Sequence, residues 1–276
     1  MTLNCKGTLI DLRVPKVMGI LNLTPDSFYD GGRYQNEKNI LAQVARMLEE
    51  GATFIDLGAQ SSRPGAQLIS EKEELNRILP VVHLLLQKFP EILLSIDTFR
   101  SEVAARCLEG GAAMINDISS GKMDEHMLPT ISNYRAPYIM MHMRGIPKDM
   151  QQRTHYADLI PDILMYFSQR IAEARSLGIH DIIVDPGFGF SKTLEQNYTL
   201  LRELSLFQNL GTPILVGLSR KSMIHKLLGV TAEQALNGST ALHMMALQKG
   251  ASFLRVHDVK EAMECVQLYN QLAKCP

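Results

Sequence analysis

Three polar side chains stand at or near the ends of apolar runs and could together bind a flat, polar ring. They are Asp97, Asn116 and Asp185, and they supply only carboxylate and amide groups. A carboxylate accepts two parallel hydrogen bonds from a heterocycle that carries a ring N–H beside an exocyclic NH₂ group. A metal is the alternative, but His142 would be its only nearby imidazole, so the set would suit only a hard cation. We favour ring binding over metal binding.

A second group of side chains is cationic and suits an anion. Arg63 lies in the loop GAQSSRPGA (58–66), whereas Arg255 and His257 are two residues apart in a strand-like run and therefore point to the same face. An arginine within an apolar strand is rare, unlike a solvated loop arginine. Two guanidiniums and an imidazole are most naturally the ligands of a phosphate or diphosphate.

The segment SRKSM (219–223) opens a helix after another apolar run. Ser219 and Ser222 suit an N-cap, and the N–H groups of the first turn, together with Lys221, would attract a carboxylate or a carbonyl oxygen. Arg220 beside Lys221 places two cations at the helix N-terminus, which opposes the helix dipole unless an anion binds. We therefore expect an anionic group of the ligand at this position.

Eight apolar runs of strand type must position these side chains. Each run is nearly continuous in apolar residues, as strands covered on both faces should be. Segments with helical spacings of three and four separate the runs. The runs are VMGILNL (17–23), FIDLGA (54–59), LLSIDT (93–98), MINDIS (114–119), YIMMHM (138–143), IIVDPG (182–187), ILVGLS (214–219) and FLRVHD (253–258).

This order predicts a single (β/α)₈ TIM barrel. Its usual length is roughly 250 residues, close to the 276 of this chain. An open doubly wound sheet is the alternative, but no GxGxxG follows the first run. No Ser- or Gly-rich linker divides the chain, so we predict one domain over residues 1–276.

Polar residues lie at the C-terminal ends of all eight runs. In a barrel these ends converge on one mouth, where active sites are found. The polar residues are Asn22, Asp56, Asp97, Asn116 with Asp117, His142, Asp185, Ser219 with Arg220, and Arg255 with His257. So many carboxylates and cations around one volume describe a pocket for a polar ligand.

Composition sets the class of protein. Lys and Arg number 28 against 29 Asp and Glu, so bulk charge argues against nucleic-acid or membrane-surface binding. We find no signal-peptide core and no run of about 18 apolar residues, and we expect a soluble, cytoplasmic protein. The four scattered cysteines suggest neither a zinc site nor disulfides, and we expect free thiols. They are Cys5, Cys107, Cys265 and Cys275.

Eight motifs, in order from the first run to the last, closely resemble those of the dihydropteroate synthase family of pterin-binding TIM barrels. They are MGILNLTPDSFYDGG (18–32), SSRPGA (61–66), SIDT (95–98), INDIS (115–119), MHM (141–143), VDPGFGFSKT (184–193), GLSRKSMI (217–224) and RVHD (255–258). The resemblance implies a transferase of folate biosynthesis. Such enzymes join 6-hydroxymethyl-7,8-dihydropterin diphosphate to p-aminobenzoate and release diphosphate.

The resemblance also implies roles for individual residues. The pterin ring would be held by five residues, with Met141 packed on the ring and Lys221 bonded to its oxygen and nitrogen. These five are Asp97, Asn116, Met141, Asp185 and Lys221. The diphosphate would be bound by Asn22, Arg63, Arg255 and His257, with Mg²⁺ beside Asn22. The p-aminobenzoate pocket would be formed by Ser62, Pro64, Phe190 and Ser222.

Two loops, TPDSFYDGG (24–32) and SSRPGA (61–66), look like the mobile pair that closes over the site in this family. The second loop departs from the family in two places. Gln60 stands where Glu is usual, and Ser62 stands where Thr is usual. Both substitutions keep hydrogen-bonding capacity, so the resemblance still implies activity.

The implied chemistry is dissociative. Loss of diphosphate from a CH₂ group on an electron-rich ring leaves a delocalised cation, so the protein must stabilise charge on both fragments. Arg63, Arg255, His257 and Mg²⁺ would stabilise the diphosphate. Asp97, with Asp185, would offset the ring charge, and Lys221 would bond to the ring. An aromatic amine is neutral near pH 7, so no general base is required before it attacks.

Two other functions stay open at this point. A pterin-binding methyltransferase of the methyltetrahydrofolate type shares the barrel and the Asp/Asn/Asp set, but it leaves the RVH and SRKS motifs without a role. A catalytically silent paralogue would bind pterin only, and the intact cationic residues Arg63, Lys221, Arg255 and His257 argue against it. The family tends to dimerise, so we expect a homodimer.

Overall fold

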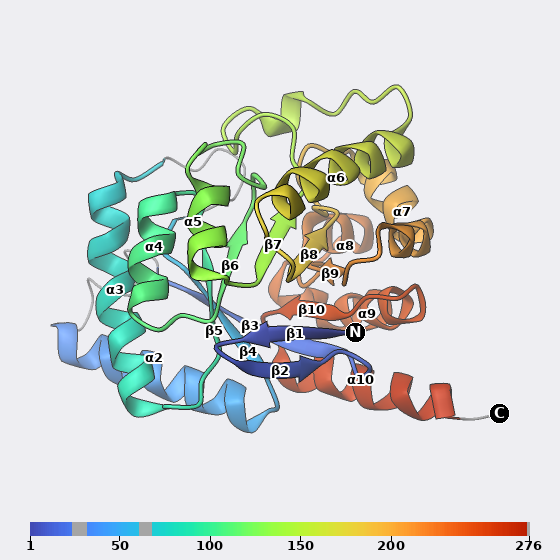
Figure 1. Cartoon of the computed structure of the whole chain (residues 1–276). Coiled ribbons are helices and arrows are strands. Elements are labelled where there is room, and N and C mark those ends of the chain that lie inside the picture. Colours follow the sequence, from blue (N-terminus) through green and yellow to red (C-terminus); the bar gives the residue numbers. More distant parts are fainter. Residues whose placement is uncertain (24–31, 61–67, 275–276) are drawn as a thin grey trace.

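A closed ring of parallel strands forms the centre of the molecule (Figure 1). The computed structural model describes residues 1–23, 32–60 and 68–274. Within them an eight-stranded sheet has the order β8-β7-β6-β5-β4-β3-β10-β9, and a parallel bridge between Val184 and Ile214 joins its two edges. The predicted TIM barrel is confirmed. The barrel strands are β3 Lys16–Asn22, β4 Phe54–Gly58, β5 Leu94–Asp97, β6 Met114–Asp117, β7 Tyr138–Met141, β8 Ile182–Asp185, β9 Leu215–Val216 and β10 Phe253–Val256.

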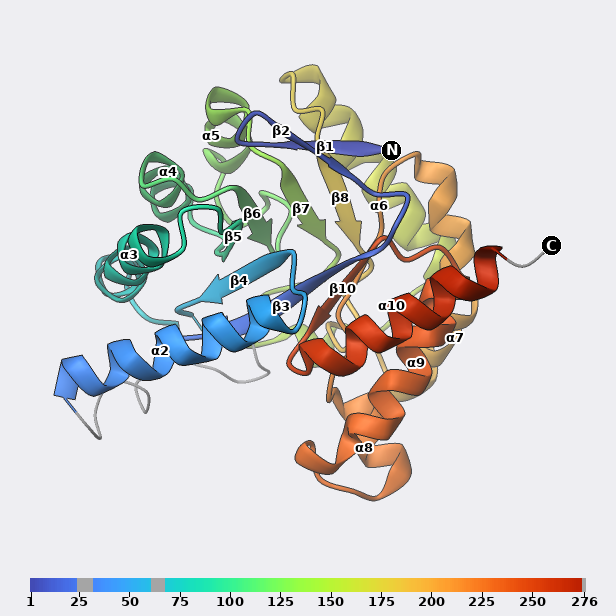
Figure 2. The same cartoon turned by 90° about the horizontal axis from the view of Figure 1, so that it is seen from below.

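Helices cover the outer face of the barrel, as Figures 1 and 2 show. They bury their apolar faces against the strands, because a parallel strand exposes apolar side chains on both of its faces. The helices are α2 Gly32–Glu49, α3 Glu71–Lys88, α4 Ser101–Glu109, α5 Met127–Tyr134, α6 Leu159–Ser176, α7 Leu194–Arg202, α8 Ser222–Leu228, α9 Leu236–Gln248 and α10 Val259–Lys274. No helix in the described ranges is long and apolar enough to cross a membrane.

A β-hairpin precedes the barrel and was not predicted from the sequence. Strands β1 (Thr2–Cys5) and β2 (Thr8–Asp11) pair antiparallel around Lys6 and Gly7, whose φ angles are 54° and 82°. Positive φ at both central residues is typical of the tight turn that matches strand twist, and a glycine at the second position is its usual signal. The Lys-Gly pair was therefore the clue to this hairpin.

The hairpin lies at the end of the barrel where the strands begin (Figures 1 and 2). Its apolar residues pack with the lowest layer of barrel side chains in one buried cluster. The cluster contains Leu3, Cys5, Leu12, Met18, Phe54, Ala113, Met114, Ile139, Ile183, Leu215 and Phe253. This end of the barrel is thus filled by apolar packing, and polar chemistry is left to the opposite end.

The cysteines that the structure describes are free, as predicted. Cys5 lies in the hairpin, Cys107 in α4 and Cys265 in α10, and all three are buried. Burial, with a smaller contribution from a nearby carboxylate, raises the thiol pKa of Cys5 and of Cys107 to about 12. These thiols are therefore inert packing groups near neutral pH. Cys275 lies outside the described residues.

Candidate active site

The three residues expected to hold a ring lie together at the carboxyl ends of the barrel strands. Asp97 ends β5 and stands beside Asn116 of β6 in the strand register, while Asp185 ends β8 beside Met141 of β7. Asn116, Met141 and Asp185 are all buried. Lys221, at the start of α8, interacts electrostatically with both Asp97 and Asp185. The structure thus brings all five predicted ring-binding residues to one mouth.

Arg255 lies inside this carboxylate group instead of forming a separate cationic site. Its Nε donates to Oδ2 of Asp56 at 2.6 Å, and its Nη2 donates to Oδ2 of Asp97 at 2.9 Å. Asn116 donates its Nδ2 to the same oxygen of Asp56 at 3.1 Å. The cations were predicted to lie apart from the ring-binding residues, and for Arg255 that prediction is wrong. Side chains near the carboxyl ends of four different strands meet inside one narrow barrel, which the linear pattern could not show.

Burial sets the charge balance at the mouth. It raises the pKa of Asp97 to about 7 although Arg255 opposes the shift, and it raises the pKa of Asp185 although Lys221 opposes it. Burial lowers the pKa of Lys221 to about 8. Burial also disfavours the charge of Arg255, but Asp56 and Asp97 outweigh it and raise the pKa of that guanidinium. Carboxylates whose pKa is raised, and which receive few hydrogen bonds from the protein, can accept hydrogen bonds from a ligand.

Lys221 is held over the loop that follows β8. Its Nζ donates to the carbonyl oxygen of Phe188 and lies 4.8 Å from the ring centre of Phe190. Lys221 is itself the N-cap residue of α8, and Ser222 is the first residue of that helix with an exposed side chain. The predicted serine N-caps are therefore wrong. The helix begins at Ser222, so its N-cap position falls on Lys221, between the two serines.

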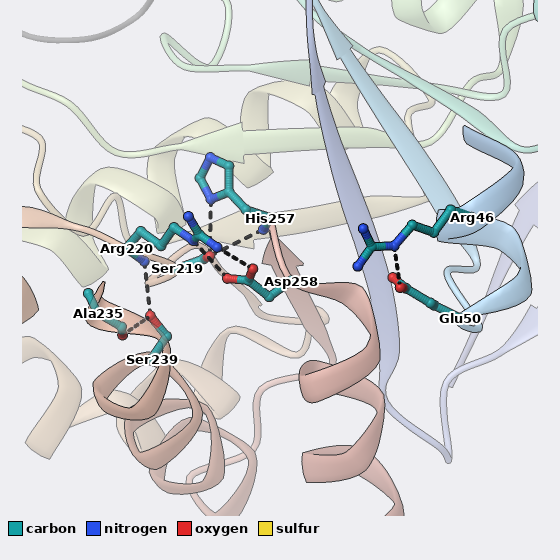
Figure 3. A network of polar contacts seen from close by, with 8 residues as sticks. All are labelled: Arg46, Glu50, Ser219, Arg220, Ala235, Ser239, His257 and Asp258. Carbon is teal, nitrogen blue, oxygen red and sulfur yellow. Dashed lines mark hydrogen bonds and ion pairs between the residues drawn. The ribbon is translucent and has the colours of Figure 1, made fainter. Parts of the chain in front are cut away.

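A network of polar contacts joins the loop after β9 to the loop after β10 (Figure 3). Arg220 makes two hydrogen bonds to the carboxylate of Asp258, of 2.9 Å and 2.5 Å. Its N–H donates to Ser239 of α9 at 3.0 Å, which supports the left-handed φ of 56° at Arg220. Asp258 therefore balances the Arg220 charge. An anionic ligand was predicted for the pair Arg220 and Lys221, and for Arg220 this prediction is wrong, because the anion comes from the protein itself.

The same network positions His257. Its N–H donates to Oγ of Ser219 at 3.2 Å, and its Nδ1 lies 3.0 Å from the same oxygen (Figure 3). The side chain of His257 is exposed at the end of β10, whereas Arg255 is only partly exposed. Arg255 lies within β10 and bonds to the carboxylates of Asp56 and Asp97, whereas His257 lies one residue beyond the end of that strand, at the rim.

Sequence reasoning missed a buried lysine next to the site. Lys192 is 3% exposed, and its Nζ contacts Nδ1 of His142 at 3.2 Å. It also donates to the carbonyl oxygens of Gly187 and Phe190 at 2.9 and 3.0 Å. Burial and then Lys192 lower the pKa of His142 well below its usual value. His142 is thus the contact of a buried lysine. The signal in the sequence was the lysine at the end of the motif GFGFSK (187–192), because a lysine is rarely found among apolar residues unless its charge has partners.

Glycine is required where this loop passes β7. Gly187 has a φ of 74°, and a Cβ added there would lie 2.1 Å from the carbonyl oxygen of His142. Its N–H donates to Oδ1 of Asp185 at 2.8 Å, which orients that carboxylate. The Asp-Pro-Gly sequence (185–187) at the end of β8 therefore orients the Asp185 carboxylate as well as turning the chain.

Some predicted site residues lie outside the described residues. These are Ser62, Arg63 and Pro64, together with most of the loop 24–32 and all of the loop 61–66. Gln60, which departs from the family pattern, accepts a hydrogen bond from the N–H of Ile69 at 2.8 Å. A glutamate oxygen would accept the same bond, so this contact is retained by the substitution.

Asn22 lies at the rim, at the end of β3, with an exposed side chain. Its neighbour in the strand register is Gly58 of β4. A Cβ at Gly58 would lie 3.7 Å from Oδ1 of Asn22 and 3.6 Å from Oδ2 of Asp97. The glycine therefore leaves space between an amide oxygen and a carboxylate oxygen, both of which are donors that Mg²⁺ accepts.

Comparison with known proteins agrees with this geometry. The model of the family described as pterin binding enzyme matches residues 18–257. The dihydropteroate synthase of Escherichia coli K12 is 43% identical over 270 residues, which cover 97% of this chain and 95% of the relative. The chain belongs to the pterin-binding enzyme family. Within it, the full-length relatives place the chain among the dihydropteroate synthases, which are transferases.

Solved structures show the same fold with ligands. A Yersinia pestis dihydropteroate synthase in a sulfonamide drug complex superimposes with a TM-score of 0.93 and 43% identity, and the whole of each chain is covered. The Xanthomonas albilineans enzyme in complex with 7,8-dihydropteroate gives a TM-score of 0.88 and 36% identity, again with full coverage of both chains.

Proposed function

We propose that the barrel mouth joins 6-hydroxymethyl-7,8-dihydropterin diphosphate to p-aminobenzoate and releases 7,8-dihydropteroate and diphosphate. The observation that carries this proposal is the set of Asp97, Asn116 and Asp185, of which Asn116 and Asp185 are buried and Asp97 is partly buried, with Lys221 beside it. It occurs in a chain whose relatives bear the name of this activity over nearly their full length. The product bound in the Xanthomonas albilineans structure contains both halves that the reaction joins.

The ring-binding residues divide the work by chemical type. Asp185 is oriented by the N–H of Gly187, so its remaining oxygen faces ring donors. Asp97 offsets positive charge that grows on the ring. Lys221 donates to the ring oxygen and nitrogen, and the apolar Met141 packs on the ring face.

The diphosphate binds towards the rim, where His257 and Asn22 are exposed. Arg255 and Arg63 supply guanidiniums to its oxygens. The oxygen donors at Asn22 fit Mg²⁺, which usually takes one or two protein oxygens and completes its shell with phosphate oxygens and water. When bound there, Mg²⁺ would neutralise charge on the leaving diphosphate.

The reaction breaks one bond and forms another at the methylene carbon. The C–O bond to the diphosphate breaks, and its electron pair leaves on the diphosphate, which Arg255 and His257 stabilise. The lone pair of the amine nitrogen then attacks the methylene carbon, and the proton lost from nitrogen passes to solvent. Phe190 and Ser222, with Ser62 and Pro64, form the p-aminobenzoate pocket, where a sulfonamide would compete.

We further propose a cytoplasmic homodimer. Several large apolar side chains are exposed on the last three helices, which lie together at one side of the barrel (Figure 2). They are Leu227, Leu228, Met245, Leu268 and Leu272. Exposed apolar groups in number are typical of an interface between subunits. A light-scattering mass near 31 kDa, that of one chain of 30.9 kDa, would refute the homodimer.

A turnover assay tests the function. Protein, the pterin diphosphate, p-aminobenzoate and Mg²⁺ are mixed, and 7,8-dihydropteroate and diphosphate are quantified by chromatography. We expect stoichiometric formation of both products. Binding of the pterin without turnover would show a silent paralogue, and methyl transfer from methyltetrahydrofolate would show the methyltransferase.

Asp185→Asn tests the ring site. An amide cannot accept two donors without turning its own NH₂ towards one of them, so calorimetry should detect no binding of a diphosphate-free pterin. The fold should persist, because the variant removes a buried carboxylate whose pKa is raised by burial. Unchanged pterin affinity in the folded variant would remove Asp185 from the ring site.

A further inference from the structure

Asp56 is a fully buried charged residue at the mouth, and the roles assigned so far do not use it. Its side chain is 0% exposed, within β4. One oxygen, Oδ2, accepts from Nε of Arg255 at 2.6 Å and from Nδ2 of Asn116 at 3.1 Å. Its other oxygen, Oδ1, is buried without a hydrogen-bond partner in the described part of the chain. A carboxylate buried in this way is costly, so its retention calls for a function.

Asp56 fixes the orientation of the side-chain amide of Asn116. An ionised carboxylate only accepts hydrogen bonds, so the amide must turn its NH₂ group towards Asp56. Its carbonyl oxygen, Oδ1, therefore faces away from Asp56. Asn116 is thus presented to a ligand as an acceptor, which selects a ring that offers an N–H at that position.

Asp56 also fixes one end of the Arg255 guanidinium. Nε is bonded to Asp56, which is fully buried, while Nη2 is bonded to Asp97, which is a proposed ring ligand. A ring that takes both oxygens of Asp97 displaces Nη2 but leaves the Nε bond intact. The bond from Nε to Asp56 then holds the guanidinium in place. Its Nη groups and its charge can bind an anion at the rim.

We propose that Asp56 is a positioning residue that couples the two substrate subsites. Through Asn116 it orients the ring site, and through Arg255 it makes the binding of a pterin favour the binding of diphosphate. The inference rests on the proposed function for the identity of the two ligands. Asp56 itself touches neither ligand.

A merely structural role predicts a different response to substitution. Replacing Asp56 by Asn keeps the volume but leaves Arg255 with Asp97 as its one ionic partner in the described part of the chain, so the free energy of unfolding should fall. The amide at position 56 would, however, offer an NH₂ group that turns Asn116 round and weakens the hold on Nε. We therefore expect Asp56→Asn to lose coupling while the protein stays folded.

Asp117 provides a matched control. It is also 0% exposed at a strand end, on β6, two strands from β4. Its oxygens accept from Tyr138, Ser119 and Gly121, which are not proposed ligand-binding residues. Asp117→Asn should lower thermal stability and leave the coupling between subsites unchanged.

Calorimetry measures the coupling directly. Inorganic diphosphate with Mg²⁺ is titrated into the full chain with and without a saturating diphosphate-free pterin. Wild type should bind diphosphate on the order of 5–150-fold more tightly with the pterin, and pterin affinity should rise by the same factor with diphosphate. Asp56→Asn should reduce that factor to about one, and pterin alone should bind about tenfold or more weakly, as for a lost hydrogen bond to charge.

Wild-type coupling in Asp56→Asn would overturn the proposal, as would its loss in Asp117→Asn. If wild type binds neither ligand, the proposed function fails before this test begins, so the two failures are distinguishable. A variant that does not fold is replaced by a measurement on wild type, the exchange rate of the Arg255 Nε–H by NMR. We expect that proton to stay protected when pterin is added, and faster exchange would overturn the proposal.

Discussion

Two layers of the barrel, built from the same two strands, show opposite solutions to burial. Phe54 of β4 and Phe253 of β10 are fully buried at the hairpin end, with ring centres 5.8 Å apart. Two residues further along each strand, on the same face, Asp56 and Arg255 form an ion pair of 2.6 Å. One layer is closed by apolar packing, and the next carries paired charges.

The difference shows that one layer of the barrel contributes packing stability and the other carries the chemistry. The lower layer needs only complementary shapes, and the hairpin excludes water from it. The upper layer has two carboxylates that share one guanidinium, so its charges are only partly balanced until a ligand arrives. If the charges of the upper layer were fully balanced without a ligand, a polar ring would gain little free energy by binding there.

The lower layer should lose stability without losing chemistry when Phe253 is truncated. We expect Phe253→Ala to lower the free energy of unfolding by about 3–5 kcal/mol, because a large cavity opens in a filled core. Urea unfolding gives the loss, and steady-state kinetics on the folded variant at low temperature should give a kcat close to that of wild type. A large fall in kcat would show that the two layers are not independent.

The upper layer should lose chemistry when Arg255 is removed. Charge on the diphosphate grows as the C–O bond breaks, so Arg255→Ala should raise the barrier by about 3–4 kcal/mol, or 10²–10³ in kcat. Arg255→Lys should recover only part of this, because an ammonium cannot bond Asp56 and Asp97 as a planar fork does. Steady-state kinetics decides the matter, and a kcat within about threefold of wild type in Arg255→Ala would make this arginine structural.

Ring affinity should depend on pH only through the upper layer. Burial raises the pKa of Asp97 to about 7, and a ring with two donors needs the ionised form. We expect pterin affinity to fall about tenfold per pH unit below that value. Calorimetry from pH 5.5 to 8 tests this. Asp97→Asn should bind weakly with no such slope, and a slope that survives the substitution would assign the titration to another group.

The same pKa has a consequence for stability with the sign reversed. In the unfolded chain Asp97 has a pKa of about 3.9, so between that value and about 7 the folded state binds more protons. The contribution of Asp97 is therefore fully present below about pH 4 and is lost as pH rises through about 7. Unfolding free energies of the ligand-free protein should show this decline, and Asp97→Asn should lack it.

The smallest effect is expected at the rim network. Arg220 and Asp258 are partly exposed, with side chains 30% and 17% accessible, so solvent screens their attraction. Asp258→Asn should change the free energy of unfolding by about 1 kcal/mol or less, as measured by urea unfolding. The double variant with Arg220→Gln should add little, and a coupling well above that range would place this network with the buried charges instead.

Much of the fold and of the site was predictable because periodicity and strand ends are local properties. The runs around Asp97, Asn116 and Asp185 are apolar and short, and each ends in a polar residue, which suffices to predict a barrel with a polar mouth. The hairpin was missed because its signal is the single pair Lys6-Gly7. Lys192 was missed because a lysine is expected to be exposed unless its hydrogen-bond acceptors are known.

The sequence by itself determined the types of group at the mouth and their order along the chain. It determined that Asp56 and Arg255 each come two residues after a phenylalanine, Phe54 and Phe253. Only the tertiary structure decided which of these groups meet. Strands β4 and β10 are 199 residues apart at the Asp56–Arg255 contact, and closure of the barrel brings them to either side of β3. Pair contacts inside a barrel depend on strand tilt and register, and those are properties of the closed sheet and not of any one strand.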